Sequence, residues 1–204
     1  CSMKSAIHRP ARSPPLRTMK EKMSDLQKAA TFDLLEGLLK KAKSFGATGA
    51  DIVLSDSSSM AVTRRFDKPE SIERAEEADI GLRVFVGKKS AIVSSSDRSN
   101  DALTQMAERA VAMASSAPED AYAGLADAAD LATSFPDLEL YDAAEIPVDT
   151  MIEYADRAET AAREIKGVTN SDGAEFAVGK DIVYYVASNG FAGSYASSGF
   201  SLSV

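Results

Sequence analysis

Histidine and cysteine are the residue types that most often hold zinc or act in nucleophilic catalysis, and this chain has one of each. They are His8 and Cys1, and both lie within the first ten residues. The sequence after residue 22 therefore offers no imidazole or thiol for a zinc ion, a Ser-His-Asp triad or a Cys-His pair. We predict that this chain contains no catalytic residue and no metal ligand.

The carboxylates are numerous enough to be tested for a cation site or an acid–base pair. One group lies in a single loop and lacks the glycine and the terminal Glu of a calcium-binding loop: Glu119, Asp120, Asp127 and Asp130. A second group alternates with arginines, as is typical of a solvated strand face: Glu70, Glu73, Glu76, Glu77 and Asp79. A self-sufficient hydrolase with a carboxylate-bound Mg²⁺ or Ca²⁺ is thus the least favoured function.

The formal net charge of −8 is unevenly distributed. Residues 1–22 carry six basic side chains and one acid, so the remaining residues sum to −13. We interpret residues 1–22 as a disordered basic extension or an upstream remnant, and residues 23–204 as one domain. An acidic body repels phosphate backbones, so we expect no direct nucleic-acid binding. We also expect no membrane association, because no apolar run approaches the roughly 18 residues of a membrane span.

Three segments have the periodicity of amphipathic helices. They are residues 32–45, 100–115 and 149–166. Thr31 is the predicted N-cap of the first helix and Gly46 its stop, and Ser99 is the predicted N-cap of the second. Residues 117–147 carry little regular pattern, and a loop of this length is usually functional or draped over a core face.

Two blocks of short strands surround the second and third helices. The first block has strands at residues 50–54, 60–66, 71–78, 80–86 and 90–94, and the second at residues 175–178, 181–187 and about 195–204. Predicted hairpin turns lie at Gly87-Lys88-Lys89, Gly179-Lys180 and Asn189-Gly190. We predict an α+β fold with a largely antiparallel sheet packed with about three helices, in one sheet or two layers. Because Val204 ends an alternating apolar strand, we also expect this chain to be a fragment.

Several segments resemble the TldD/PmbA family. They are RRFDKPESIERAEEADIGLRVFVGKKSAIVSSSD (residues 64–97), GVTNSDGAEF (167–176) and SNGFAGSYASSGFSLSV (188–204). PEDAYAGLAD (118–127) and FPDLELYD (135–142) are similar to the PmbA, or TldE, branch in particular. The resemblance covers about residues 30–204 in the same order, so it is more specific than one short motif.

The resemblance implies a chain about twice this length that acts in a cytoplasmic, heterodimeric zinc metallopeptidase. In such pairs the TldD-type subunit holds zinc through an HExxxH helix and a later Cys. The PmbA-type subunit lacks that motif and helps to enclose unfolded peptide substrates. The resemblance therefore implies no cofactor in this chain, zinc in a TldD-like catalytic partner, and a non-catalytic role here. An alternative is a non-enzymatic binding module linked to modulation of DNA gyrase or to a toxin–antitoxin system.

The small-residue strands near the end of the chain are candidates for a substrate or subunit contact, because they allow close approach of another backbone. The candidate residues are Ser188, Asn189, Gly190, Gly193 and Tyr195. Packing against the other half of a longer chain is the competing explanation, and the stronger one.

Overall fold

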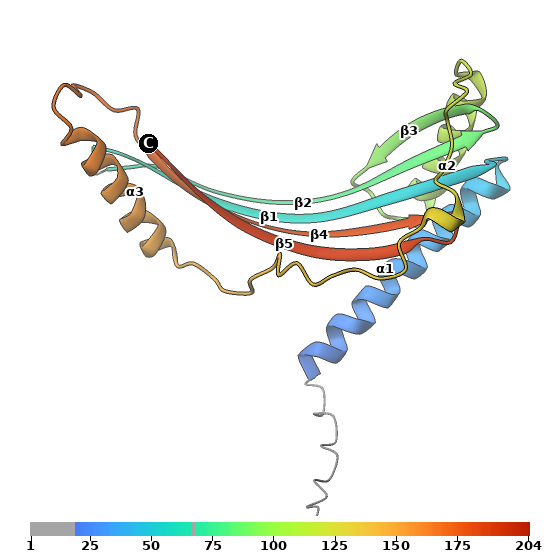
Figure 1. Cartoon of the computed structure of the whole chain (residues 1–204), viewed down its shortest axis with the longest axis horizontal. Coiled ribbons are helices and arrows are strands. Elements are labelled where there is room, and N and C mark those ends of the chain that lie inside the picture. The colour runs from blue at the N-terminus through green and yellow to red at the C-terminus, as the bar shows by residue number, and fades with distance from the viewer. Residues whose placement is uncertain (1–18, 67) are drawn as a thin grey trace, which may run out of the picture.

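The computed structural model describes residues 19–66 and 68–204, which form three α-helices, one short 3-10 helix and five strands (Figure 1). The helices are α1 (Met19–Ser44), α2 (Asn100–Ser116), η1 (Ala128–Asp130) and α3 (Val148–Arg163). The strands are β1 (Gly49–Arg65), β2 (Lys68–Val86), β3 (Lys89–Ser95), β4 (Ala174–Ala187) and β5 (Ala192–Ser203). None of the helices in this part of the chain is long and apolar enough to cross a membrane.

All five strands belong to one antiparallel sheet with the order β3-β2-β1-β4-β5. The predicted α+β fold is therefore confirmed, and the two strand blocks form one sheet because β4 pairs with β1 along Asp51–Arg64. In Figure 1 the sheet is long and curved, with α1 and α2 at one end and α3 at the other. The long loop between α2 and α3 passes beneath β5 in that view.

The strands are longer than the sequence pattern predicts. The predicted strands at 50–54 and 60–66 are one strand, β1, and those at 71–78 and 80–86 are one strand, β2. The predicted hairpin at Gly179-Lys180 is wrong, because both residues lie inside β4. Pairing explains the difference: Ser59 lies between Ala75 of β2 and Gly179 of β4, so the backbone is hydrogen-bonded on both sides through a polar stretch.

The first helix begins earlier than predicted. Residues 1–18 of the predicted extension lie outside the described residues, and residues 19–22 belong to α1. Thr31 is therefore not an N-cap; its hydroxyl donates a hydrogen bond to the carbonyl of Gln27 inside the helix, at 3.0 Å. The end of the helix is as predicted, since Gly46 has a φ of 111°.

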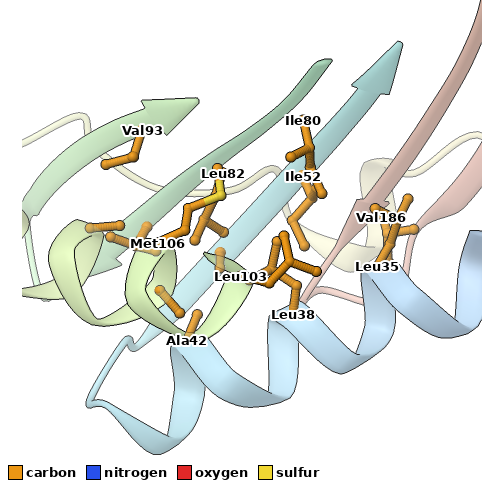
Figure 2. Close-up of a cluster of buried hydrophobic side chains, with 14 of the residues drawn as sticks. Leu35, Leu38, Ala42, Ile52, Ile80, Leu82, Val93, Leu103, Met106 and Val186 are labelled. Carbon is orange, nitrogen blue, oxygen red and sulfur yellow. The ribbon is translucent and has the colours of Figure 1, made fainter. Parts of the chain in front are cut away.

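The larger core lies between α1, α2 and the adjoining end of the sheet. Figure 2 shows Leu35 and Leu38 of α1 and Leu103 and Met106 of α2 directed onto Ile52 and neighbouring strand residues. Ser99 caps α2 as predicted, since its hydroxyl accepts the amide of Ala102. The periodic face of α2 is confirmed, because its predicted apolar residues are all buried: Leu103, Met106, Ala107, Ala110, Val111 and Ala114.

A second, smaller core lies under α3 at the other end of the sheet, where Met151 and Ala155 pack on Val62 and Phe176. Two polar contacts fix this helix to β1 and the residue after it. Arg64 makes a two-pronged ion pair with Asp156, with donor–acceptor distances of 2.7 and 3.1 Å. The buried Glu159 accepts the amide of Phe66 at 2.8 Å. The helix ends at Arg163, so Ile165, predicted on its buried face, is exposed.

Candidate functional site

A groove of about 890 Å³ lies between residues 135–142, which we call the arch, and the β4–β5 hairpin. The arch is the extended part of the long loop that runs beside β5. The amide of Ser198 donates to the carbonyl of Leu140 at 2.9 Å, and the Ser198 hydroxyl accepts the amide of Asp142 at 2.8 Å. At its other end the ring of Phe135 meets that of Phe191 edge-on, at 6.0 Å between centroids. The arch is thus attached at both ends and spans the groove between them.

The lining of the groove is aromatic and acidic. Five aromatic side chains contribute to it: Phe135, Tyr141, Tyr185, Phe191 and Tyr195. Asp137 and Glu139 add two carboxylates, and none of the described residues that line the groove is basic. Tyr195 is about half exposed, so its ring is accessible from solvent. Such a lining suits a ligand that is partly apolar and carries positive charge.

The wall of the groove is held by a polar network inside the sheet. Asp51 is almost completely buried and forms a two-pronged ion pair with Arg83. The hydroxyl of Tyr185 donates to the same carboxylate at 2.8 Å. Burial, and then this hydrogen bond, raise the pKa of Tyr185 to about 12. The phenol therefore remains a neutral donor at ordinary pH, which fixes the ring of Tyr185 at the groove.

A second hollow of about 710 Å³ lies on the opposite face of the sheet. Its strand residues include Val178 and Lys180 of β4, and alternation directs these to the other side from Val183 and Tyr185. The ammonium group of Lys180 lies 5.9 Å from the centre of the Tyr141 ring. This hollow is lined by both polar and apolar strand residues and shares residues of the arch, so the arch has a cavity on each side.

The five predicted contact residues divide into two groups. Gly193 and Tyr195 line the groove. Ser188, Asn189 and Gly190 form the β4–β5 connection and make contacts within the chain. The Ser188 hydroxyl accepts the amide of Ala50 at 2.9 Å, and the Asn189 side chain donates to the carbonyl of Ala126 at 3.0 Å. Their geometry fits a structural turn, and contact with a substrate or subunit stays a prediction for all five.

The described side chains are not grouped as a metal site. Among the side chains of residues 26–66 and 68–204, no three His, Cys, Asp or Glu residues are grouped so that they could hold a metal ion. Glu119, Asp120, Asp127 and Asp130 lie in the long loop between α2 and α3, and they form no such group. We therefore assign no catalytic step to a metal bound by these residues.

Sequence reasoning missed most of the groove. Residues 135–141 lie in a stretch with little regular pattern, although Phe135, Leu138, Leu140 and Tyr141 give it a high apolar content for an exposed segment. That apolar content was the available signal. Tyr185 and Phe191 carry no local signal of a groove. They lie opposite the arch because of contacts between segments that are about 50 residues apart in sequence.

Comparison with known proteins identifies two matches to models of one family. The model described as PmbA/TldA metallopeptidase domain 1 matches residues 50–114, and the model of the PmbA/TldA metallopeptidase central domain matches residues 141–204. In the structure both regions contribute to a single sheet, because β1 of the first pairs with β4 of the second. The arch begins in the interval between the two matches and ends in the second.

Curated relatives support the same assignment. The chain is 34% identical over 186 residues to a metalloprotease PmbA homolog of Haemophilus influenzae, covering 91% of this chain and 40% of that protein. It is 32% identical over 156 residues to metalloprotease PmbA of Escherichia coli, covering 76% of this chain and 35% of the relative. This chain thus spans about two fifths of the length of the relatives that it matches.

Solved structures share the fold. A Bacteroides thetaiotaomicron protein, described as a candidate modulator of DNA gyrase, matches with a TM-score of 0.73 and 25% identity, over 83% of this chain and 39% of that one. TldE of Thermococcus kodakarensis matches with a TM-score of 0.65 and 16% identity, over 82% of this chain and 37% of that one. Because the Thermococcus protein is only 16% identical, its similarity to this chain shows the fold alone.

Proposed function

Since the chain belongs to the PmbA/TldD metallopeptidase family, we propose that it acts as part of a non-catalytic, PmbA (TldE)-type subunit of a heterodimeric zinc metallopeptidase. The zinc in this proposal belongs to a TldD-like partner. The observation that carries the proposal is the pair of consecutive family matches, together with two curated relatives that are both described as PmbA.

The residue inventory supports the assignment of catalysis to a partner. The chain has one His and one Cys, at positions 8 and 1, so zinc ligands of these types are not available from residues 19–204. The role that remains for this chain is to shape the site and to hold substrate. We place that role in the cytoplasm, as the resemblance to the family implies.

The proposed substrate is an unfolded peptide, and the groove supports this choice. Extended peptides are commonly held by the backbone of a strand edge, with pockets for alternate side chains. The groove lies beside the edge strand β5 and includes Gly193 and Tyr195 from the predicted contact set. These two are the residues that we propose to meet substrate, whereas Ser188, Asn189 and Gly190 are assigned to the turn.

The proposal is tested by co-purification and hydrolysis. The chain is expressed with and without a TldD-like protein that carries an HExxxH motif, and cleavage of an unfolded protein such as reduced casein is followed. We expect a stable complex with the partner, cleavage by the complex, and none by this chain alone. Hydrolysis by the purified chain alone, or failure to bind any TldD-like partner, would refute the proposal. A partner in which the motif's Glu is replaced by Gln is the control for contaminating protease.

A second candidate function is a non-enzymatic module that modulates DNA gyrase, favoured by the description of the Bacteroides relative. If such a module acted on DNA directly, its binding would weaken steeply with salt. The net charge of −8 disfavours direct contact with DNA. The two functions are separated by the casein assay and a gyrase supercoiling assay run on the same preparations.

A further inference from the structure

We propose that the groove between the arch and the β4–β5 hairpin binds an extended peptide segment that carries Lys or Arg. The inference rests on the proposed function only in that the ligand is a peptide. It adds the place where the peptide lies and the charge that it carries. Three independent features of the groove support it: a free strand edge, the absence of charge on that edge, and the aromatic and acidic lining.

The first feature is the backbone of β5 within the groove, which has no partner among the described residues on the side away from β4. The amide of Ser198 points away from β4, because it donates to Leu140 of the arch. Amide direction alternates along a strand, so the backbone groups of Ser194 and Ala196 point the same way. Both residues line the groove, and in the described part of the chain neither amide donates a hydrogen bond to the arch. The arch pairs with β5 at Ser198 and leaves the neighbouring edge open for another strand.

The second feature appears when β5 is compared with the part of β2 that extends beyond β3 on the other side of the sheet. Within the described ranges, β2 pairs only with β1 along residues 68–79, and this stretch is dense in charged residues and contains Pro69. Charges and proline on an edge strand are a usual protection against pairing with another chain. β5, over Ala192–Ser203, contains no charged residue and no proline. This part of β2 is therefore protected against pairing with another chain, whereas β5 is suited to accept a strand.

The third feature sets the charge of the ligand. Asp137 and Glu139 face a groove with no basic residue in its lining, and the aromatic faces around them attract cations. Asp137 accepts the amide of Glu139, at 3.0 Å, and both carboxylates lie on exposed residues. Lys180, on the far side of the arch, already lies against the ring of Tyr141. A Lys or Arg side chain of a peptide in the groove can contact an aromatic ring in the same way.

The test measures binding of labelled peptides to the 204-residue chain by fluorescence anisotropy. The probes are ten-residue peptides of Gly, Ser and Leu that differ only at two central positions, which carry Lys, Gln or Glu. We expect the Lys peptide to bind at least about tenfold more tightly than the Glu peptide at low salt, and this ratio to shrink at high salt. Equal affinities for the three peptides would overturn the proposal.

Two pairs of variants locate the binding site. Asp137→Asn/Glu139→Gln is expected to weaken the Lys peptide about fivefold or more, whereas the matched pair Glu73→Gln/Glu77→Gln on β2 leaves it within twofold. Tyr195→Leu retains apolar volume and removes the ring, so it weakens the Lys peptide more than the Gln peptide. Tyr122→Leu, at a residue that is 95% exposed and outside the groove, has no effect. Equal losses from both charge pairs would show that net charge alone attracts the peptide, and would refute the site.

These results are independent of proteolysis. Loss of charge selectivity in a chain that still supports cleavage with its partner would contradict the groove proposal and leave the proposed function standing. Selective binding of the Lys peptide by a chain that never supports cleavage would contradict the proposed function and leave the groove proposal standing. All the substituted side chains are exposed, so circular dichroism should confirm that each variant is folded.

Discussion

The ion pair between Asp51 and Arg83 gives an asymmetric prediction for stability. Asp51 is 4% exposed, while the Arg83 side chain is 43% exposed. Removal of Asp51 therefore leaves a cation that can be rehydrated, but removal of Arg83 leaves a carboxylate that water cannot reach. Breaking a fully buried pair costs about 3–5 kcal/mol, mainly through the charge that is left behind.

Asp51→Ala is accordingly expected to lower the free energy of unfolding by about 2–3 kcal/mol, because solvent screens the remaining Arg83. Arg83→Met should lower it by about 3–4 kcal/mol, because the Tyr185 hydroxyl alone cannot compensate the buried Asp51. For a domain of this size, the Asp51→Ala loss corresponds to a melting temperature lower by roughly 6–9 °C.

Urea denaturation followed by far-UV circular dichroism measures both losses, with the denaturant slope as a check that the transition remains two-state. The control is Glu76→Ala, which breaks an ion pair with Arg74 in which both side chains are 67% exposed. We expect this control to cost less than about 0.5 kcal/mol. The reasoning fails if Asp51→Ala costs no more than the control, or if Asp51→Ala is clearly more damaging than Arg83→Met.

Three further predictions concern the cores, the turns and the polar network. Leu38→Ala, at a wholly buried residue, should cost about 2–5 kcal/mol in urea unfolding, whereas Ile165→Ala, at a residue 62% exposed, should cost under about 0.5; equal costs would contradict the position of the core. Gly173→Ala should lower the free energy of unfolding by more than about 3 kcal/mol, because φ is 102° and the added Cβ would lie 2.6 Å from a backbone oxygen of β1. The control Gly167→Ala, at a residue with a similar φ and open space around it, should lower it by about 1–2 kcal/mol. A difference under about 1 kcal/mol between the two variants would refute the clash. The pKa of Tyr185 is raised to about 12, so between pH of about 10 and 12 the folded state keeps a proton that the unfolded state loses. The contribution of this phenol to stability is therefore complete below pH of about 10 and is lost as the pH rises towards 12. Absorbance at 295 nm should show a late-titrating tyrosine that is absent in Tyr185→Phe; an unchanged titration in that variant would contradict the hydrogen-bonded phenol.

The sequence by itself determined the features that depend on neighbouring residues. Ser99 caps α2 because a serine hydroxyl reaches an amide three residues ahead. Gly87 and Asn189-Gly190 mark two of the hairpin connections, because φ is 61° at Gly87 and 98° at Gly190. The α+β class and the family resemblance followed from the same local patterns and quoted segments. The inventory of one His and one Cys also set the proposed division of labour with a partner.

The tertiary structure decided what depends on distant residues. β1 runs unbroken through Ser55–Ser59 because β2 and β4 satisfy its backbone on both sides, and hydrogen bonding of the backbone does not require an apolar side-chain pattern. The Asp51 network joins residues 32 and 134 positions apart, and the groove joins the arch to a hairpin about 50 residues later. Local propensity contains no information about such pairs, because they form only when the chain loses the conformational entropy of closing long loops.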